Sequence, residues 1–296
     1  MAHYTATAGA DNITQTGDND TLTVLEATIQ PVDFFDGAGA FDTIVIGSVG
    51  NGITADLSAA GTDPTHGLHH YEALAFRNTS GTDISIAKFA GDQSGTDLIS
   101  TSLAVRGVNG TQQDITIETD SNFSASRWTF THWEKYLDFI EIFGGSASNV
   151  LIGSRTNDSL DGGAGTDTLI GGLGGDLLFG GPDADTFKFN RTTEIPPLKK
   201  GPFGFGGDEI LDFWHAEGDR IDVHNIDANT LRVGNQNFHF IGHQAFHHRP
   251  GELQVIRHGP HLVTVAGDIN GDGKADFVIG VEPFDGHALV KGDFVL

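Results

Sequence analysis

The sequence predicts an all-β protein: a parallel β-roll (β-solenoid) of nonapeptide repeats with a β-sandwich-like C-terminal cap and a β-rich N-terminal region. Three observations support this class. A nine-residue repeat runs through residues 144–188. The chain has 41 glycines and one methionine, which favours turns and short strands over long helices. Alternating or β-branched segments recur between Gly, Asn and Asp turns. We therefore divide the chain into a β-rich region of unknown role at 1–143, a β-roll at 144–190, a linker at 191–206 and a cap at 207–296.

The N-terminal region contains two loose copies of the repeat, ATAGADNIT at 6–14 and QTGDNDTLT at 15–23. Asp11 and Asp20 are nine residues apart in them, as are Ile13 and Leu22. The segment DGAGAFDTIVIG at 36–47 resembles a repeat with one residue inserted. These segments predict either a continuation of the solenoid or ordinary turn–strand–turn structure.

Five consecutive units begin at Gly144: GGSASNVLI, GSRTNDSLD, GGAGTDTLI, GGLGGDLLF and GGPDADTFK. Each predicts a six-residue glycine-rich turn and a three-residue strand with one large apolar side chain pointing inward. Position eight holds that apolar residue, namely Leu151, Leu160, Leu169, Leu178 and Phe187. Position six is polar, namely Asn149, Asp158, Asp167, Asp176 and Asp185. Because two units form one 18-residue coil, Asp158 and Asp176 are expected on one edge, and Asp167 and Asp185 on the other.

The stacked carboxylates predict a bound cation. Strands of successive coils lie ~4.8 Å apart, so facing carboxylates repel by roughly 3 kcal/mol at an effective dielectric of ~20. A divalent cation removes that repulsion, and an oxygen shell completed by turn carbonyls suits calcium better than magnesium. We expect several calcium ions, held by carboxylates and backbone of these turn residues: Gly144, Gly145, Ala147, Asn149, Gly153, Arg155, Asp158, Gly162, Gly163, Ala164, Gly165, Asp167, Gly171, Gly172, Leu173, Gly174, Asp176, Gly181, Asp183 and Asp185.

These units resemble the repeats-in-toxin (RTX) nonapeptide GGxGxDxUx, where U is a large apolar residue. The resemblance implies a parallel β-roll that binds calcium. The third and fourth units match well. The first has Asn149 in place of Asp and Ala147 in place of Gly, and the second lacks its second glycine. We therefore expect the outermost sites to be weaker or missing.

After the linker, the segments LVTVA at 262–266 and ADFVIGV at 275–281 predict strands joined in a hairpin. The C-terminal succession resembles the C-terminal domain of serralysin-type secreted metallopeptidases, and with the β-roll the resemblance covers residues 144–296. It implies a cap on the roll that carries a type I secretion signal at Asp293-Phe294-Val295-Leu296. The protein is then expected outside a Gram-negative cell, with the type I secretion apparatus as a partner.

The C-terminal segment also contains a candidate calcium loop. Alternate-residue spacing like that of an EF-hand is found for Asp268, Asn270, Asp272 and Asp276. The twelfth position, which normally supplies a bidentate acid, is Ile279. An acidic hairpin turn with side-chain-to-backbone hydrogen bonds is the alternative.

Composition excludes several classes. The net charge of −24 disfavours nucleic acid and anionic lipid as partners. No apolar stretch approaches ~20 residues, so we expect no transmembrane segment, and the first residues lack the pattern of a Sec-type signal. There is no cysteine, no HExxHxxGxxH zinc motif and no GxSxG elbow, so we assign no catalytic residue. Histidine groups at 66–70 and 239–248 fit either a transition-metal site or half-exposed histidines.

The sequence thus predicts a secreted protein that folds on calcium after type I export. A non-enzymatic adhesion, matrix or host-interaction factor is the preferred function. The alternative is a calcium-dependent enzyme that modifies an extracellular polysaccharide, with its active site in the N-terminal region. An extracellular polysaccharide or a host surface is the expected partner beyond calcium.

Overall fold

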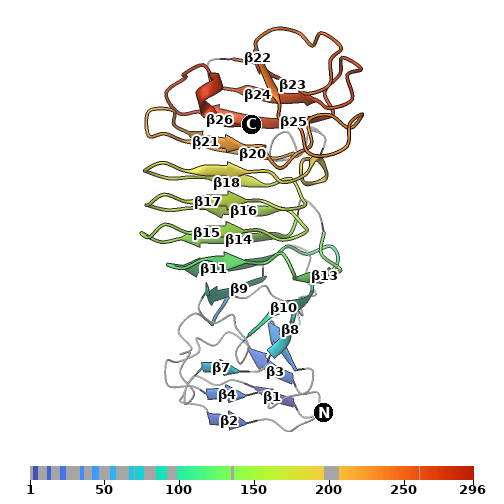
Figure 1. Ribbon diagram of the computed structural model, residues 1–296. Coiled ribbons are helices and arrows are strands. Elements are labelled where there is room, and N and C mark those ends of the chain that lie inside the picture. Colours follow the sequence, from blue (N-terminus) through green and yellow to red (C-terminus); the bar gives the residue numbers. More distant parts are fainter. Residues whose placement is uncertain are drawn as a thin grey trace. The chain divides into compact units, whose positions relative to one another are not determined.

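The computed structural model describes residues 99–134, 137–196, 207–259 and 261–296. Before residue 99 it describes only the segments 3–5, 12–14, 21–24, 34–36, 42–46, 54–57, 67–69, 71–76 and 85–91. The described elements are β-strands and short 3-10 turns, which confirms the all-β class (Figure 1). No described helix is long and apolar enough to cross a membrane. The chain forms two compact units: Met1–Thr119 with Phe123–Ile142, and Asp120–Asn122 with Phe143–Leu296.

The strand pairings that the structure describes within unit 1 are all parallel. A six-stranded sheet has the order β1 (His3–Thr5), β3 (Thr21–Val24), β5 (Thr43–Ile46), β8 (Tyr71–Phe76), β10 (Ile99–Arg106) and β13 (Thr129–Thr131). A three-stranded sheet contains β2 (Asn12–Thr14), β4 (Phe34–Asp36) and β7 (Gly67–His69). Four further strands follow one another in another sheet: β6 (Thr54–Asp56), β9 (Ser85–Ala90), β11 (Gln113–Thr119) and β14 (Phe139–Gly144). The short strand β12 spans Phe123–Ser124.

The core of unit 1 is a column of aligned apolar side chains. Leu22 is in register with Ile44, Ile44 with Leu74, and Leu74 with Val105. None of these four is more than 2% exposed. The loose repeats at the start of the chain place Ile13 in β2 and Leu22 in β3, which belong to different sheets, whereas Asp11 and Asp20 lie outside the described residues.

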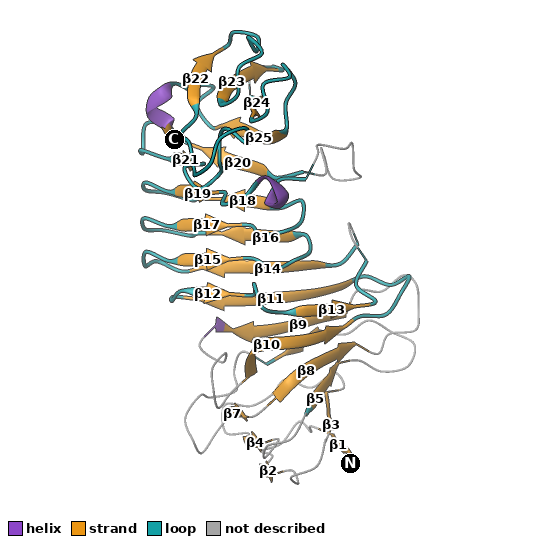
Figure 2. Cartoon of the chain, turned by 45° about the vertical axis from the view of Figure 1, so that its right-hand side comes forward, coloured by secondary structure: helices purple, strands orange, loops and turns teal. Residues whose placement is uncertain are grey.

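Unit 2 begins with the β-roll, whose strands alternate between two sheets (Figure 2). One sheet has β15 (Val150–Ile152), β17 (Thr168–Ile170), β19 (Thr186–Lys188), β21 (Arg220–Asp222) and β26 (Phe294–Val295), all parallel. The other has β16 (Asp158–Asp161), β18 (Leu177–Phe179), β20 (Glu209–Phe213) and β25 (Phe277–Pro283), also parallel. The predicted parallel β-roll is confirmed.

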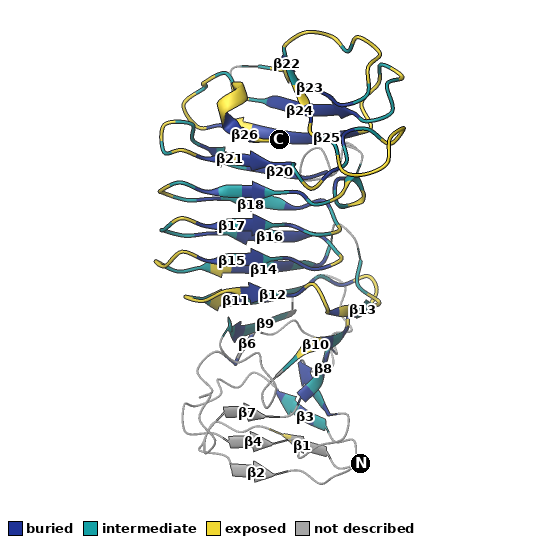
Figure 3. Cartoon of the chain, viewed as in Figure 1, coloured by how far each residue is buried: buried dark blue, intermediate teal, exposed yellow. Residues whose placement is uncertain are grey.

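The apolar residue at position eight aligns from coil to coil. In the first sheet Leu151 is in register with Leu169, and Leu169 with Phe187; in the second, Leu160 is in register with Leu178. All five are 0% exposed, and the roll strands are largely buried in Figure 3. One side chain per nine residues therefore builds the apolar interior of the roll.

The roll continues beyond the linker. Leu178 is in register with Ile210, and Phe187 with Ile221, so β20 and β21 form a further coil. Residues at the same place in successive coils are 32 or 34 positions apart in the sequence here, whereas they are 18 apart in the preceding coils. The segment 191–206 accounts for most of the excess; it includes the 3-10 turn η2 (Thr192–Glu194), and residues 197–206 lie outside the described part.

The C-terminal strands complete unit 2. β22 (His239–Gly242) is parallel to β23 (Glu252–Arg257), which is antiparallel to β24 (Val263–Asp268), and β24 is antiparallel to β25. This confirms the hairpin predicted from 262–266 and 275–281. A 3-10 turn, η3 (Lys291–Asp293), leads into β26, whose Phe294 is in register with Ile221 of the roll.

Candidate metal centre

The polar residues at position six form two ladders along the roll. The first ladder contains Asn149, Asp167, Asp185 and Asp219, and the second contains Asp158, Asp176 and Asp208. In both, the side-chain oxygen of one coil accepts a hydrogen bond from the backbone N–H of the equivalent residue in the preceding coil. All seven residues are at most 3% exposed. The ladders therefore place a column of acidic side chains inside each edge of the roll.

In the first ladder, the backbone N–H of Asn149 donates to Asp167 Oδ1 at 2.6 Å. The N–H of Asp167 donates to Asp185 Oδ1 at 2.8 Å, and that of Asp185 to Asp219 Oδ1 at 2.9 Å. Each of these carboxylates thus uses Oδ1 to join two coils. For Asp167 and Asp185, the second oxygen, Oδ2, is buried and accepts no hydrogen bond from the described part of the chain.

Burial makes the ionised form of these acids costly. It raises the pKa of Asp185 to about 8, with further contributions from the charges of Asp219 and Asp167. Burial likewise raises the pKa of Asp167. A buried carboxylate oxygen without a partner is unfavourable unless a cation or proton compensates it. These oxygens, with the turn carbonyls beside them, have the hard oxygen chemistry that calcium prefers. The first ladder therefore fits calcium.

Carboxylate and carbonyl oxygen atoms occupy the space where a side chain at position one of the repeat would lie. A Cβ on Gly162 would lie 2.6 Å from Asp167 Oδ2 and 2.6 Å from the carbonyl oxygen of Gly180. A Cβ on Gly180 would lie 2.5 Å from Asp185 Oδ2. Real Cβ atoms do not approach oxygen so closely, so a side chain at position one would displace the carboxylate. Glycine is needed here because backbone and carboxylate oxygens crowd the same space.

The second ladder begins differently. The carboxylate of Asp158 accepts the backbone N–H of Ser154 at 2.6 Å through Oδ2, and the Ser154 hydroxyl at 2.9 Å through Oδ1. Ser154 occupies the position of the missing second glycine. Burial raises the pKa of Asp158 well above its usual value, and the charge of Asp176 raises it further. The protein itself thus satisfies Asp158, which supports the expectation of a weaker site in the second unit.

The other predicted turn residues surround the ladders mainly with backbone. Asp183 has a positive φ of 86° and accepts the N–H of Gly165 at 3.3 Å. Ala164 donates its N–H to the carbonyl of Gly145 at 2.9 Å. The remaining predicted residues in these turns are Gly144, Ala147, Gly153, Arg155, Gly163, Gly171, Gly172, Leu173, Gly174 and Gly181. Among them Ala147, Arg155 and Leu173 are exposed.

Sequence reasoning missed three acids in the coil after the linker. Asp208 and Asp219 extend the two ladders. Asp212 accepts the N–H groups of Gly180 and Gly181, both at 2.9 Å, one through each oxygen. A signal existed, because Asp208 and Asp219 each precede an isoleucine by two residues, as position six precedes position eight. Burial raises the pKa of Asp219 to about 6 and also raises that of Asp212.

The loop at 268–276 has the contacts expected of an acidic hairpin turn, the alternative to an EF-hand-like calcium loop. Both oxygens of Asp268 accept backbone N–H groups, from Gly271 at 2.6 Å and Gly273 at 2.9 Å. Asp276 accepts the N–H of Ile269 at 2.7 Å and the amide of Asn270 at 2.6 Å. In the same loop, Asn270 accepts the N–H of Asp272 at 2.8 Å. The loop thus forms an acidic hairpin turn closed by side-chain-to-backbone bonds, and its calcium site stays a prediction.

The histidines engage in separate contacts. Nδ1 of His243 is 2.9 Å from the carbonyl of Val255, and Nδ1 of His248 is 2.9 Å from that of Asp272. His247 pairs with Glu252. Among the residues that the structure describes, no three His, Asp or Glu side chains group closely enough to hold a metal ion. The candidate calcium sites therefore combine carboxylates with backbone carbonyls. The side chains of the group at 66–70 lie outside the described part.

Comparison with known families agrees with this geometry. The family model of the RTX calcium-binding nonapeptide repeat (4 copies) matches residues 143–178 and 162–188. The model of the FG-GAP repeat matches residues 262–293, which include β24, β25 and the 268–276 loop. No curated protein matches the chain. Residues 143–188 are thus RTX calcium-binding repeats, and the chain contains a calcium-binding region of the RTX type.

Proposed function

We propose that this RTX protein is secreted by a type I system and folds on calcium outside the cell. The observation that carries the proposal is the pair of buried carboxylate oxygens, Asp167 Oδ2 and Asp185 Oδ2, that lack a hydrogen-bond partner among the described residues. Without a cation these groups destabilise the folded roll, because each must be desolvated or protonated. Calcium would supply the positive charge that makes the ionised ladder stable.

Within the ladder the residues have distinct roles. Asp167 and Asp185 would hold the ion with Oδ2 while Oδ1 fixes the spacing of successive coils. The carbonyls of Gly162 and Gly180, in the adjoining turns, would complete the oxygen shell. Because each bridging carboxylate contacts two coils, binding at one turn orders the next. Calcium stabilisation then grows with ion concentration and spreads along the roll.

The C-terminal segment supports export before folding. Phe294 pairs with the roll strand β21, and the buried Asp293 accepts the N–H of Val290 at 2.7 Å. The proposed secretion terminus is therefore part of the folded structure, and an exporter would have to recognise it in the unfolded chain. Calcium-poor cytosol keeps the acidic roll open, and the higher calcium outside closes it. As part of this proposal, residues 207–296 form a serralysin-like cap on the roll, and the chain divides into the four parts 1–143, 144–190, 191–206 and 207–296.

The activity we propose beyond calcium binding is that of a non-enzymatic adhesion, matrix or host-interaction factor. One observation favours the alternative, a polysaccharide-modifying enzyme. Burial raises the pKa of Asp114 in unit 1 to about 6, which is a suitable value for a general acid. A panel of polysaccharides assayed with calcium separates the two: turnover lost in Asp114→Asn supports the enzyme, and absence of turnover supports the binding factor.

Calcium titration of the chelated protein tests the main proposal. We expect far-ultraviolet circular dichroism to show a cooperative gain of β-structure, with calorimetry detecting more than one bound ion. Magnesium at the same concentration should not reproduce the change. A spectrum indifferent to calcium, with no heat of binding, would overturn calcium-coupled folding.

A further inference from the structure

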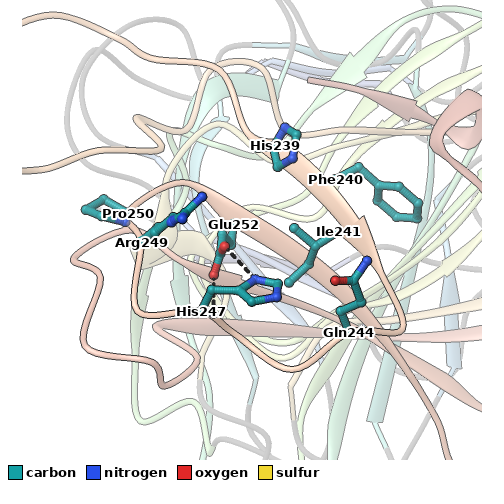
Figure 4. A pocket seen from close by; sticks show the side chains of 8 residues that line it. All are labelled: His239, Phe240, Ile241, Gln244, His247, Arg249, Pro250 and Glu252. Atoms are coloured by element: carbon teal, nitrogen blue, oxygen red, sulfur yellow. Dashed lines mark hydrogen bonds and ion pairs between the residues drawn. The ribbon is translucent and has the colours of Figure 1, made fainter.

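A cavity of about 660 Å³ lies in the C-terminal part of unit 2, and its lining residues, drawn in Figure 4, include none of the ladder residues. Its wall comes from β22, the start of β23 and the segment between them. Imidazole, guanidinium, amide and carboxylate groups face it beside the aromatic ring of Phe240. A volume of this size is typical of small-molecule sites, and such a mixture of groups matches a polar ligand with a ring.

The charges of the cavity contrast with those of the whole chain. The protein carries −24 overall, yet residues 238–251 contain four histidines and Arg249 and no acidic residue. Within the part of the chain that the structure describes, the Arg249 side chain has no hydrogen bond or ion pair. A free guanidinium on a cavity wall is suited to a planar carboxylate, which it can bind through two parallel hydrogen bonds.

The single acid of the cavity is already satisfied. Glu252 is 4% exposed, and its Oε2 accepts the backbone N–H of His247 at 2.6 Å. Its Oε1 lies 2.9 Å from Nδ1 of the same residue. Although burial raises the pKa of Glu252, these bonds and the charges of His247 and Arg249 outweigh burial and lower it. Glu252 is therefore an anchored carboxylate that orients the His247 ring; its charge acts on Arg249, but no hydrogen bond joins the two side chains in the described part of the chain, so the guanidinium keeps its N–H donors for a ligand.

This anchoring leaves hydrogen-bonding groups for a hydroxylated ligand. With Nδ1 of His247 held by Glu252, the other ring nitrogen is turned toward the side of Gln244 in Figure 4. Phe240 packs on Phe294 with ring centroids 5.2 Å apart, which fixes its orientation beside the cavity. Sugar hydroxyls both donate and accept, so they match imidazole and amide groups, and an apolar sugar face matches an aromatic ring.

We propose that this cavity binds an acidic saccharide, with its carboxylate on Arg249, its hydroxyls on His247 and Gln244, and a sugar ring against Phe240. The site is separate from the calcium ladders and does not depend on the role proposed for them. It identifies the kind of extracellular polymer that this protein would contact, namely one that contains uronic acid.

Calorimetric titration of the calcium-saturated full chain with digalacturonate tests the proposal. We expect saturable binding by the wild type and about tenfold weaker binding by Arg249→Gln, as for a lost charge-assisted hydrogen bond. Arg232→Gln is the matched control, because Arg232 carries the same charge, does not line the cavity and makes no side-chain hydrogen bond or ion pair with the described residues. Its affinity should equal that of the wild type.

A neutral digalactose of the same size should bind at least tenfold more weakly than digalacturonate. Circular dichroism in calcium checks that both variants fold as the wild type does. Equal weakening by Arg232→Gln and Arg249→Gln would show a general effect of net charge and overturn the site. So would equal affinity for the neutral sugar, or no binding of digalacturonate at ~10 mM.

Discussion

Replacing Asp167 by asparagine separates the cost of a buried charge from the benefit of a bound ion. Asparagine keeps the shape of the side chain and an oxygen that can accept the N–H of Asn149, now at 2.6 Å from Asp167 Oδ1. The substitution removes the negative charge and one strong calcium ligand. Without calcium the variant should be more stable than the wild type, and calcium should stabilise it less.

The magnitude follows from the ladder. Carboxylates in successive coils, ~4.8 Å apart, repel by roughly 3 kcal/mol at an effective dielectric of ~20. Part of this repulsion is already relieved by protonation, because burial raises the pKa of both Asp167 and Asp185. We therefore expect Asp167→Asn to gain about 1–2 kcal/mol in chelator. Each ion at ten times its Kd stabilises the fold by about 1.4 kcal/mol, so the calcium-dependent increment should shrink by about 1.4 kcal/mol for one lost ion and about 2.8 kcal/mol for two.

Urea unfolding followed by circular dichroism at pH 7.5, in chelator and in 10 mM calcium, measures both quantities. Asp285→Asn is the control, since Asp285 is exposed and distant in sequence from the ladder turns. Within the described part of the chain it accepts a hydrogen bond only from the N–H of His287. We expect it to change stability by less than about 0.5 kcal/mol in either condition. An unchanged calcium increment in Asp167→Asn, or an equal loss of stability with and without calcium, would refute the reasoning.

Three further predictions concern packing and protonation. Gly162→Ala should lower the free energy of unfolding by about 1–3 kcal/mol, because its Cβ would lie 2.6 Å from two oxygens. Gly259→Ala is the control: its Cβ would meet no atom within 4 Å, so its urea midpoint should equal that of the wild type. Equal urea midpoints for the two variants would contradict the crowding at Gly162. Asp185 has a pKa of about 8 in the calcium-free fold against its usual 3.8, so between pH 3.8 and pH 8 the folded state keeps a proton that the unfolded chain loses. The free energy of unfolding without calcium should therefore fall by about 1.4 kcal/mol per pH unit as the pH rises through this range. Calcium binding at pH 7 should then release protons, measured as a dependence of the binding heat on the buffer, and a heat independent of the buffer would count against it. Burial raises the pKa of Asp138 in unit 1 to about 6, so the stability that protonated Asp138 contributes is lost as the pH rises from 3.8 through 6. Hydrogen exchange in unit 1 should therefore show a weaker pH dependence in Asp138→Asn than in the wild type.

The register of the roll could be predicted from the sequence because its signal is local and periodic. One large apolar residue every nine positions fixes which side chains stack, and the structure aligns Leu151 with Leu169 and Leu160 with Leu178. The same nine-residue spacing predicts the position-six residues of the five units, four of which are acids. It also singles out the second unit, where Ser154 replaces a glycine and satisfies Asp158; a weaker calcium site there stays a prediction.

Counting failed where the period changes. The linker places Asp208 and Asp219 14 and 16 residues later than the 18-residue period would, so they lie outside the nine-residue frame although they continue both ladders. In unit 1 the paired residues have no constant spacing: Leu22 pairs with Ile44, but Ile44 with Leu74. Such long-range pairing depends on which apolar faces meet in the fold, and no local motif in the sequence specifies it.

Calcium-coupled folding of the roll requires calcium to lie between successive coils at the position-six carboxylates. Anomalous diffraction from crystals grown in calcium tests this most directly. We predict calcium peaks about 2.3–2.6 Å from Asp167 Oδ2 and Asp185 Oδ2, with turn carbonyls among the other ligands. Crystals that contain calcium only elsewhere, with these two oxygens bonded to water or protonated, would contradict the account.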